Sequence, residues 1–393
     1  MKRVVALGLC LMTFITPICA GDGMVQILDL VVRDSPRLKA AAEACKASQA
    51  ENAGIRKLDA PEFEYGMLLG SDNIGNRNDF SVKQSFDIAT ISGKKNSLAG
   101  SLDAQSAYLY KAERIEVIYD ACVLLADIVY YNGLIETLTD YQSAMKSLYD
   151  KTERSLTAGK ATAMDIGKVR LQLSSATTAT AMAVTERATL IGQLRTLSGH
   201  PDLDFTGLEF EYGGTDGDFA AWLDNAVDGS PLMQFVRTRV KSGELQLDID
   251  KMAWAPKLDV GYMAELARDE KYRGVTVGVS IPLWSNAANV RRSRAAVSQA
   301  KADDNWQEQE FITAATNAWN KAHSLEQIAS ESQSALELSD TRALLGRALE
   351  SGELSILDYL IELGMYYDAV KENLQVRQEY HHALSELARF AGL

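Results

Sequence analysis

The sequence predicts a mainly α-helical protein with two β-hairpins, built from one helix–strand–strand–helix–helix unit that occurs twice. Three observations support this fold class. Matching residues recur at a nearly constant offset along the chain. Two segments in each half alternate apolar and polar residues. The long remaining stretches are poor in proline and rich in Ala, Leu, Glu, Lys and Gln, which favour helix.

The duplication appears as pairs of residues that are separated by 195 or 193 positions. Pro36 matches Pro231 at an offset of 195. Near the end of each copy, RSLTAGKATAMD, which begins at Arg154, matches RALESGELSILD, which begins at Arg347, at an offset of 193. Matches of this kind cover almost the whole chain after the first 20 residues, so we infer that one structural unit has been duplicated.

The N-terminus has the pattern of a secretory signal peptide: two basic residues, an apolar segment, and a small residue, Ala20, at the expected cleavage site. Pro17 interrupts the apolar segment, and no later segment approaches the ~20 apolar residues of a membrane helix, so we expect no transmembrane helix. Cys19 leaves a lipid anchor as an alternative, although Ile18 is not the small residue that such a signal requires. The predicted organisation is a signal peptide (1–20), copy 1 (21–199), a Gly- and Asp-rich linker (200–215) and copy 2 (216–393).

Each copy is predicted to begin with one helix and to end with two long helices joined by a Gly-containing turn. The predicted helices cover 24–56, 93–157 and 163–198 in copy 1, and 217–253, 287–349 and 356–391 in copy 2. A helix over 93–157 would be about 98 Å long at 1.5 Å per residue. Such a helix must pack against other helices along its length, as in a bundle or coiled coil.

Two segments in each copy alternate with period two, which places apolar and polar residues on opposite faces of a strand. The apolar sets are Phe63, Tyr65 and Met67; Phe80, Val82, Phe86 and Ile88; Leu258, Val260, Tyr262, Ala264 and Leu266; and Val275, Val277, Val279, Ile281 and Leu283. The opposite faces carry the charged residues Glu62, Glu64, Lys83, Asp87, Asp259 and Glu265.

Strands of about ten residues suit either a soluble sheet with one buried face or tilted strands that cross a bilayer. The charged faces fit a polar lumen at least as well as a solvated sheet face. Trp254 and Trp284 flank the second hairpin, as interfacial aromatic residues do, but the matching positions in copy 1 are Asp59 and Ala89. Since four strands cannot close a membrane barrel, a spanning sheet would need two or three chains to share one barrel of eight or twelve strands.

Composition excludes several classes of function. The formal net charge of −13 argues against nucleic-acid binding. The four histidines, His200, His323, His381 and His382, do not combine with Cys or acidic residues at metal-ligand spacing, so we expect no metal site and no cofactor. Cys45 and Cys122, which remain after signal cleavage, are best explained as small core residues. No nucleotide-binding or catalytic motif is present, so we expect a protein that is not an enzyme.

The chain resembles the TolC family of outer-membrane efflux channels in three features: the paired motifs from Arg154 and Arg347, the duplicated helix–strand–strand–helix–helix order, and the signal peptide. Within that family the heavy-metal-efflux branch, CzcC-like and CusC-like, is nearest. The resemblance implies a homotrimer in outer-membrane lipid. Its twelve strands would form one β-barrel, continued in the periplasm by a long α-helical barrel. A periplasmic adaptor (membrane fusion protein) would connect it to an inner-membrane pump, expected to be of the resistance-nodulation-division type. Small toxic solutes or metal cations would leave passively through the tunnel.

Two alternatives stay open. One is the channel of a type I protein secretion system. The other is a non-channel periplasmic helical scaffold or adaptor with a soluble sheet, although the sequence shows no β-domain between two helices of the kind that an adaptor carries.

The paired motifs from Arg154 and Arg347 each predict a helix end, a turn and a new helix start. Gly159 and Gly352 suit the left-handed position that ends a helix. The quartets TAMD and SILD that follow have the spacing of a capping box, with Thr162, Asp165, Ser355 and Asp358 as capping residues. The resemblance assigns the two turns to the adaptor-docking tip, with residues Gly159, Lys160, Ala161, Gly352, Glu353 and Leu354.

The family closes its tunnel at this end, so the resemblance also implies a constriction. Asp358 and Glu362, spaced i,i+4, are the candidates to line it, with Tyr359 or Met365 as further candidates. A solvated helix face explains the same acidic pair, and Gly364 stands where a bulkier gating residue is expected.

Overall fold

The computed structural model describes residues 22–70, 75–203, 205, 207–210, 217–267, 270–281, 286–338 and 341–392. The predicted signal peptide with Cys19, and Trp284, lie outside the described residues. The chain forms two compact units, each with segments from both copies. Of the described residues, those within 22–40, 113–227 and 312–392 form unit 1, and those within 41–112 and 228–311 form unit 2.

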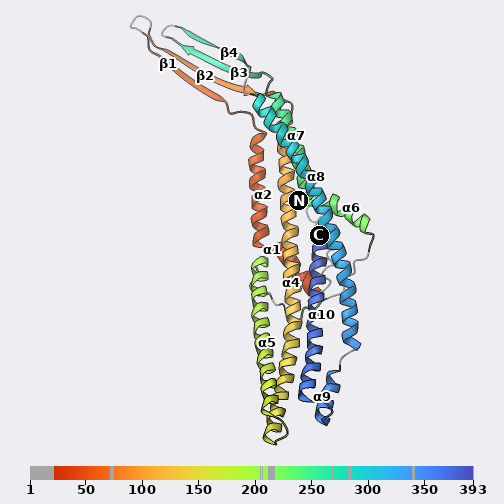
Figure 1. Cartoon of the computed structure of the whole chain (residues 1–393). Helices are drawn as coiled ribbons and strands as arrows, with labels where there is room; N and C mark the ends of the chain where they lie inside the picture. The colour runs from red at the N-terminus through yellow and green to blue at the C-terminus, as the bar shows by residue number, and fades with distance from the viewer. Residues whose placement is uncertain are drawn as a thin grey trace. The chain divides into compact units, whose positions relative to one another are not determined.

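The order of elements is repeated, as the sequence predicts (Figure 1). Copy 1 contains α1 (Asp22–Asp34), α2 (Pro36–Ile55), β1 (Glu62–Leu68), β2 (Arg77–Phe86), α3 (Ile88–Ile91), α4 (Lys94–Thr157) and α5 (Ala163–Ser198). Copy 2 contains α6 (Phe219–Gly229), α7 (Pro231–Met252), β3 (Lys257–Leu266), β4 (Lys271–Ser280), α8 (Ala287–Leu338), α9 (Arg342–Ser351) and α10 (Ile356–Ala391). The mainly helical fold class with a small antiparallel sheet is confirmed.

Three predicted helices are divided in the structure. The helices expected over 24–56 and 217–253 are each two helices, because Pro36 and Pro231 occupy the first position of α2 and α7. Proline lacks the N–H that an interior helical position needs, but its fixed φ suits the first turn. Ser230 caps α7 by accepting a hydrogen bond from the Met233 N–H. The long helix expected over 287–349 is likewise divided, into α8 and α9.

Unit 2 contains one antiparallel sheet in the order β1-β2-β3-β4. Its register aligns the apolar sets of all four strands: Phe63 pairs with Val82, Val82 with Tyr262, and Tyr262 with Val275. Many large apolar side chains on this face are exposed, with exposed fractions from 38% for Val260 to 74% for Val275. We call this set the apolar face; its exposed members are Phe63, Tyr65, Met67, Phe80, Leu258, Val260, Tyr262, Leu266, Val275, Val277 and Val279.

The predicted second strand is too long at its C-terminal end. β2 ends at Phe86, and the assignment of Asp87 to the charged strand face is wrong. Asp87 is the N-cap of α3: its carboxylate accepts a 2.7 Å hydrogen bond from the Thr90 N–H and pairs with Lys95 at 2.8 Å. A short acidic side chain suits this capping position, and the cap turns the chain out of the sheet.

The main core of unit 1 is formed by α1, α4, α5 and residues of the linker. Leu125, Ile128 and Leu194 are fully buried in it. By length and composition α4 is the one helix among the described residues that could cross a membrane, with an 18-residue window of mean hydropathy 1.4. We expected no such window from the sequence. In that window 39% of the residues are buried within the chain, and α4 contributes apolar residues to this core.

The linker between the copies is attached to unit 1 by buried aromatic residues. Phe205 is 1% exposed in the core, and its backbone carbonyl accepts a 3.3 Å hydrogen bond from Asn132. The Phe210 carbonyl accepts a 3.1 Å hydrogen bond from Arg377, and its ring stacks on His381 with centroids 4.6 Å apart. The described part of the linker is therefore a packed structural element.

The contact between Phe210 and His381 predicts a pH-dependent stability. Burial is the main cause that lowers the pKa of His381 from 6.5 to about 4, with Arg377 and His382 adding repulsion. Because the unfolded chain takes up this proton at higher pH than the folded chain, the free energy of unfolding should fall as pH drops from about 6.5 to about 4. His381→Gln should reduce this slope in urea unfolding at pH 7, 5.5 and 4.5. His323→Gln, at an exposed position, is the matched control, and an unchanged slope in His381→Gln contradicts the prediction.

Candidate functional site

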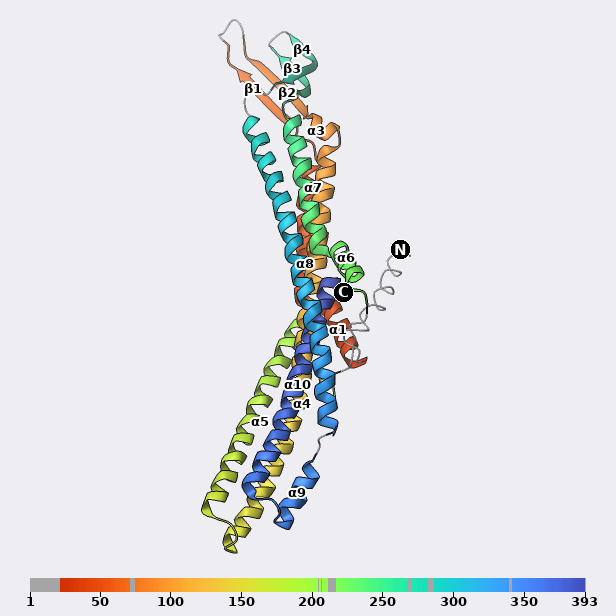
Figure 2. The same cartoon turned by 45° about the vertical axis from the view of Figure 1, so that its right-hand side comes forward.

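The two turns that the sequence predicts have the same backbone structure. Gly159 and Gly352 have φ values of 71° and 78°. The N–H groups of the two residues that follow each glycine donate to one helix carbonyl, that of Ser155 in copy 1 and that of Ala348 in copy 2. These four hydrogen bonds, 2.8–3.3 Å long, recur at the offset of 193. Figures 1 and 2 show both turns at the same end of the unit 1 helices.

The predicted helix caps are present. In copy 1 the Thr162 hydroxyl accepts from the Asp165 N–H at 3.2 Å, and the Asp165 carboxylate accepts from the Thr162 N–H at 3.0 Å, which completes a capping box. In copy 2 the Ser355 hydroxyl accepts from the Asp358 N–H at 3.1 Å, and among the described residues the reciprocal backbone bond is not formed. Hydrogen bonds from Thr162 hold the pKa of Asp165 below its usual value.

Substitution by alanine should change the stability of the protein in opposite directions at the turn glycine and at a glycine in the next helix. Gly159→Ala should destabilise the protein by about 1–2 kcal/mol, because alanine is strained at φ of 71°. Gly167→Ala, in the interior of α5 with open space around its Cβ position, should stabilise it by up to about 1 kcal/mol. Urea unfolding followed by circular dichroism measures both; equal signs would contradict the assigned role of Gly159.

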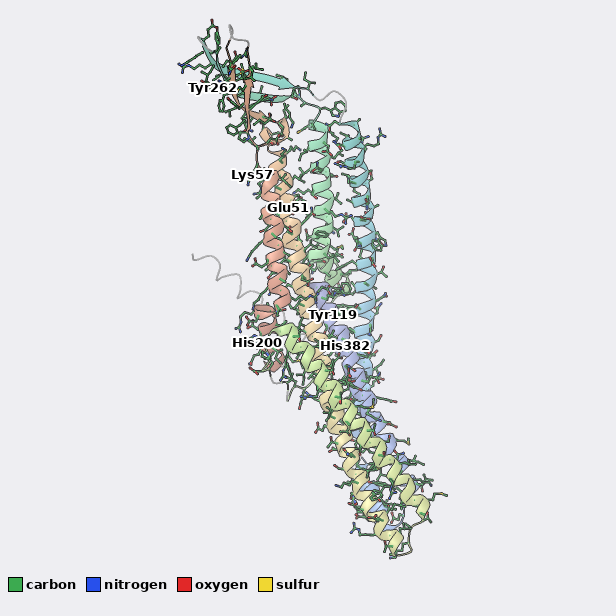
Figure 3. All side chains as sticks on the ribbon, turned by 90° about the vertical axis from the view of Figure 1, so that its left-hand side faces the viewer. Glu51, Lys57, Tyr119, His200, Tyr262 and His382 are labelled. Carbon is green, nitrogen blue, oxygen red and sulfur yellow. The ribbon has the colours of Figure 1, made fainter. Side chains whose placement is uncertain are left out.

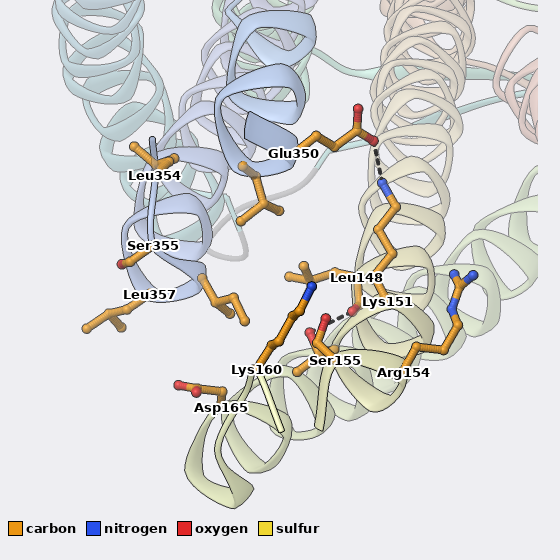
Figure 4. Close-up of a pocket in the computed structure, with 13 residues that line it drawn as sticks. Leu148, Lys151, Arg154, Ser155, Lys160, Asp165, Glu350, Leu354, Ser355 and Leu357 are labelled. Carbon is orange, nitrogen blue, oxygen red and sulfur yellow. Dashed lines mark hydrogen bonds and ion pairs between the residues drawn. The ribbon is translucent and has the colours of Figure 1, made fainter. Parts of the chain in front are cut away.

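A cavity of about 700 Å³ lies between the two turns (Figure 4). Its apolar lining consists of Leu148, Leu349, Leu354, Ile356 and Leu357. Its charged lining consists of Lys151, Arg154, Lys160, Asp165 and Glu350. Lys151 and Glu350, one from each copy, form a 2.7 Å ion pair, and this hydrogen bond lowers the pKa of Glu350. The structure therefore brings together the two turns, which are 193 residues apart in the sequence.

The candidate constriction residues lie on the N-terminal part of α10. Asp358 and Glu362 are exposed, together with Met365 on the same side of the helix. Asp358 is engaged in the cap with Ser355, whereas Glu362 makes no hydrogen bond or ion pair within the described part of the chain. Tyr359 is half-buried and packs against the core formed by α4, α5 and α10, so it lies apart from the exposed acidic pair. The assignment of a constriction to these residues stays a prediction.

The remaining charged strand residues lie on the face opposite the apolar face. Glu62 pairs with Lys83 at 3.7 Å, and buried Asp259 accepts a 2.5 Å hydrogen bond from Ser85. Glu265 pairs with Arg77 at 2.6 Å. Arg77 also contacts Asp79 at 2.9 Å. Neither residue was predicted from the sequence, although both continue the alternation of β2. Glu64 forms no ion pair among the described residues. The lumen role of this face stays a prediction.

All four histidines have partners within unit 1; His323 Nδ1 lies 4.0 Å from a carboxylate oxygen of Glu326. The His200 ring contacts Asp34 at 3.1 Å, and the His382 ring contacts Asp127 at 2.8 Å; both histidines are labelled in Figure 3. His381 stacks on Phe210. Within the described residues there is no group of three His, Cys, Asp or Glu side chains that could hold a metal ion.

Comparison with solved structures shows the fold. The chain is similar to the CmeC outer-membrane channel of Campylobacter jejuni, with 14% identity, TM-score 0.78, and coverage of 94% of this chain and 86% of that one. The open MtrE outer-membrane channel of Neisseria gonorrhoeae gives 14% identity, TM-score 0.79, and coverage of 94% and 89%. CusC, described in connection with transmembrane channel formation, gives 12% identity, TM-score 0.76, and coverage of 95% and 93%.

No protein-family model and no curated protein matches the chain. The similar solved structures are channels, and the chain has their fold over nearly its whole length. CusC matches no better than CmeC or MtrE, so the fold does not favour the predicted heavy-metal branch.

Proposed function

We propose that this protein is the outer-membrane channel of a tripartite efflux system, and that it belongs to the TolC family. The observation that carries the proposal is the apolar face. A soluble protein rarely leaves so many large apolar side chains exposed on one contiguous surface. The opposite face of the same sheet bears ion pairs, as expected for strands with lipid on one side and a polar lumen on the other.

The edges of the sheet support a barrel that several chains share. β1 and β4 each pair on one side only within the chain. Lipid does not tolerate unpaired strand edges, so β4 of one chain should pair with β1 of the neighbouring chain. Three chains with four strands each would close a barrel of twelve strands, in agreement with the resemblance to the family.

The remaining parts of the proposal rest on the resemblance to the family. The helices would form a tunnel in the periplasm. The two turns with their common cavity would meet an adaptor, which connects the channel to an inner-membrane pump of the resistance-nodulation-division type. Asp358 and Glu362 would line the tunnel constriction, and Glu62, Glu64, Lys83, Asp259 and Glu265 would face the barrel lumen. Small toxic solutes or metal cations would be the exported substrates, with no chemical conversion.

Fractionation and conductance test the channel itself. The full-length protein should fractionate with the outer membrane, migrate as a heat-modifiable trimer, and form ion-conducting pores in planar bilayers. A soluble, non-conducting monomer would refute the channel and favour a periplasmic scaffold. A deletion strain should become sensitive to organic toxic compounds or to metal cations; a defect limited to one secreted protein would indicate type I secretion.

A further inference from the structure

The cavity between the two turns carries an unbalanced positive charge. It is lined by the cations Lys151, Arg154 and Lys160 and by the acids Asp165 and Glu350. Both acids are already engaged, Glu350 with Lys151 and Asp165 with the N–H and hydroxyl groups of Thr162. The cavity therefore has no free carboxylate for its remaining cations.

Lys160 is the cation most available to an incoming group. Its backbone N–H completes the turn by donating to the Ser155 carbonyl at 2.8 Å, but its ammonium group has no partner among the described residues. Figure 4 shows the Lys160 side chain extending from the turn into the space between the two turns. Arg154, by comparison, donates its Nε to the Asp150 carbonyl at 3.1 Å.

The second turn does not offer the same group. Glu353 stands at the position that matches Lys160, with the same backbone hydrogen bond to the residue five positions earlier, but it does not line the cavity. The two turns thus have a common backbone and opposite charge at the matching position. An occupant that approaches the cavity meets a cation from copy 1 and apolar side chains from both copies.

We propose that the cavity binds a carboxylate-bearing side chain flanked by aliphatic residues, presented by the proposed adaptor, with Lys160 as the group that binds the carboxylate. This inference rests on the proposed function, in which an adaptor meets the two turns. Aliphatic neighbours of the carboxylate would pack on Leu354, Ile356 and Leu357, while the ammonium group of Lys160 would form a charge-assisted hydrogen bond. The ion pair at this partly open site should strengthen binding by about fivefold.

The test uses the full-length channel in detergent and synthetic, fluorescently labelled peptides. Three peptides differ only at one position, flanked by leucines, that carries Glu, Gln or Lys. Fluorescence anisotropy should give a Kd about fivefold lower for the Glu peptide than for the Gln peptide with the unmodified protein, and the Lys peptide should bind most weakly. Raising the salt concentration should reduce the difference.

Variants assign the preference to one residue. Lys160→Gln should remove the difference between the Glu and Gln peptides, and Lys160→Arg should retain it. Lys146→Gln, an exposed lysine of α4 outside the cavity, is the matched control and should leave the difference unchanged. Heat-modifiable migration verifies that each variant is assembled.

Three outcomes overturn the inference: equal binding of the Glu and Gln peptides, no detectable binding of any peptide, or a Glu preference that persists in Lys160→Gln. Conductance of the same samples in planar bilayers is recorded separately. A conducting channel without the Glu preference refutes only this inference, whereas a non-conducting protein counts against the proposed function.

Discussion

The double variant Val277→Arg/Val279→Arg is expected to lose outer-membrane assembly. Both valines are exposed on the apolar face, where they pair across to Val260 and Leu258 of β3. If this face contacts lipid, each arginine near the bilayer midplane costs about 2–4 kcal/mol, so the pair is expected to prevent stable insertion. Outer-membrane fractionation and the loss of the heat-modifiable trimer band measure the effect.

A variant on the opposite face of the same strand controls for the added charge. Thr276→Arg/Ser280→Arg introduces two arginines on the side that bears the ion pairs, and should assemble normally because that side faces water in the proposed barrel. If both double variants assemble equally well, the assignment of the lipid-facing side is incorrect. If only the control fails, the two faces of the sheet are reversed.

Phe205→Ala is expected to lower the free energy of unfolding by about 3–5 kcal/mol, since it removes a large side chain that is 1% exposed in the core of unit 1. The surrounding residues come from α1, α4 and α5, whose packing can close only part of the resulting cavity. Urea unfolding at pH 7 followed by circular dichroism measures the loss.

The matched control for this core variant is Leu171→Ala in α5, where the side chain is 73% exposed. It should change the free energy of unfolding by no more than about 0.5 kcal/mol. An equally small effect of Phe205→Ala would mean that the segment between the copies is only a tether, as its Gly- and Asp-rich composition suggests.

Several features could be predicted because they depend on neighbours a few residues away. The bounds of α5 and α10 agree with the predicted helices, since Thr162 and Ser355 cap them and a glycine ends each. The alternation of the four strands was visible for the same reason. The two proline breaks are also local signals, but the prediction continued each helix from the apolar periodicity before Pro36 and Pro231 across the proline.

Other features could not be predicted because they join distant segments. The Lys151–Glu350 pair links residues 199 positions apart. No local sequence pattern predicts the cavity that this pair borders. Asp87 continued the alternation of β2 but caps α3, because the chain leaves the sheet at that residue. His381 looked like half of an adjacent histidine pair, and only the structure shows its ring against Phe210.

By itself, the sequence determined the duplicated order of elements, the two faces of each strand and the shape of the two turns. These follow from short-range hydrogen bonds and from the period of apolar residues, which each segment carries on its own. The tertiary structure decided which faces align, where the linker is buried and which charge stays unpaired between the turns. Those outcomes depend on packing and register between segments that can be nearly 200 residues apart. The conformational preferences of each short segment do not determine them.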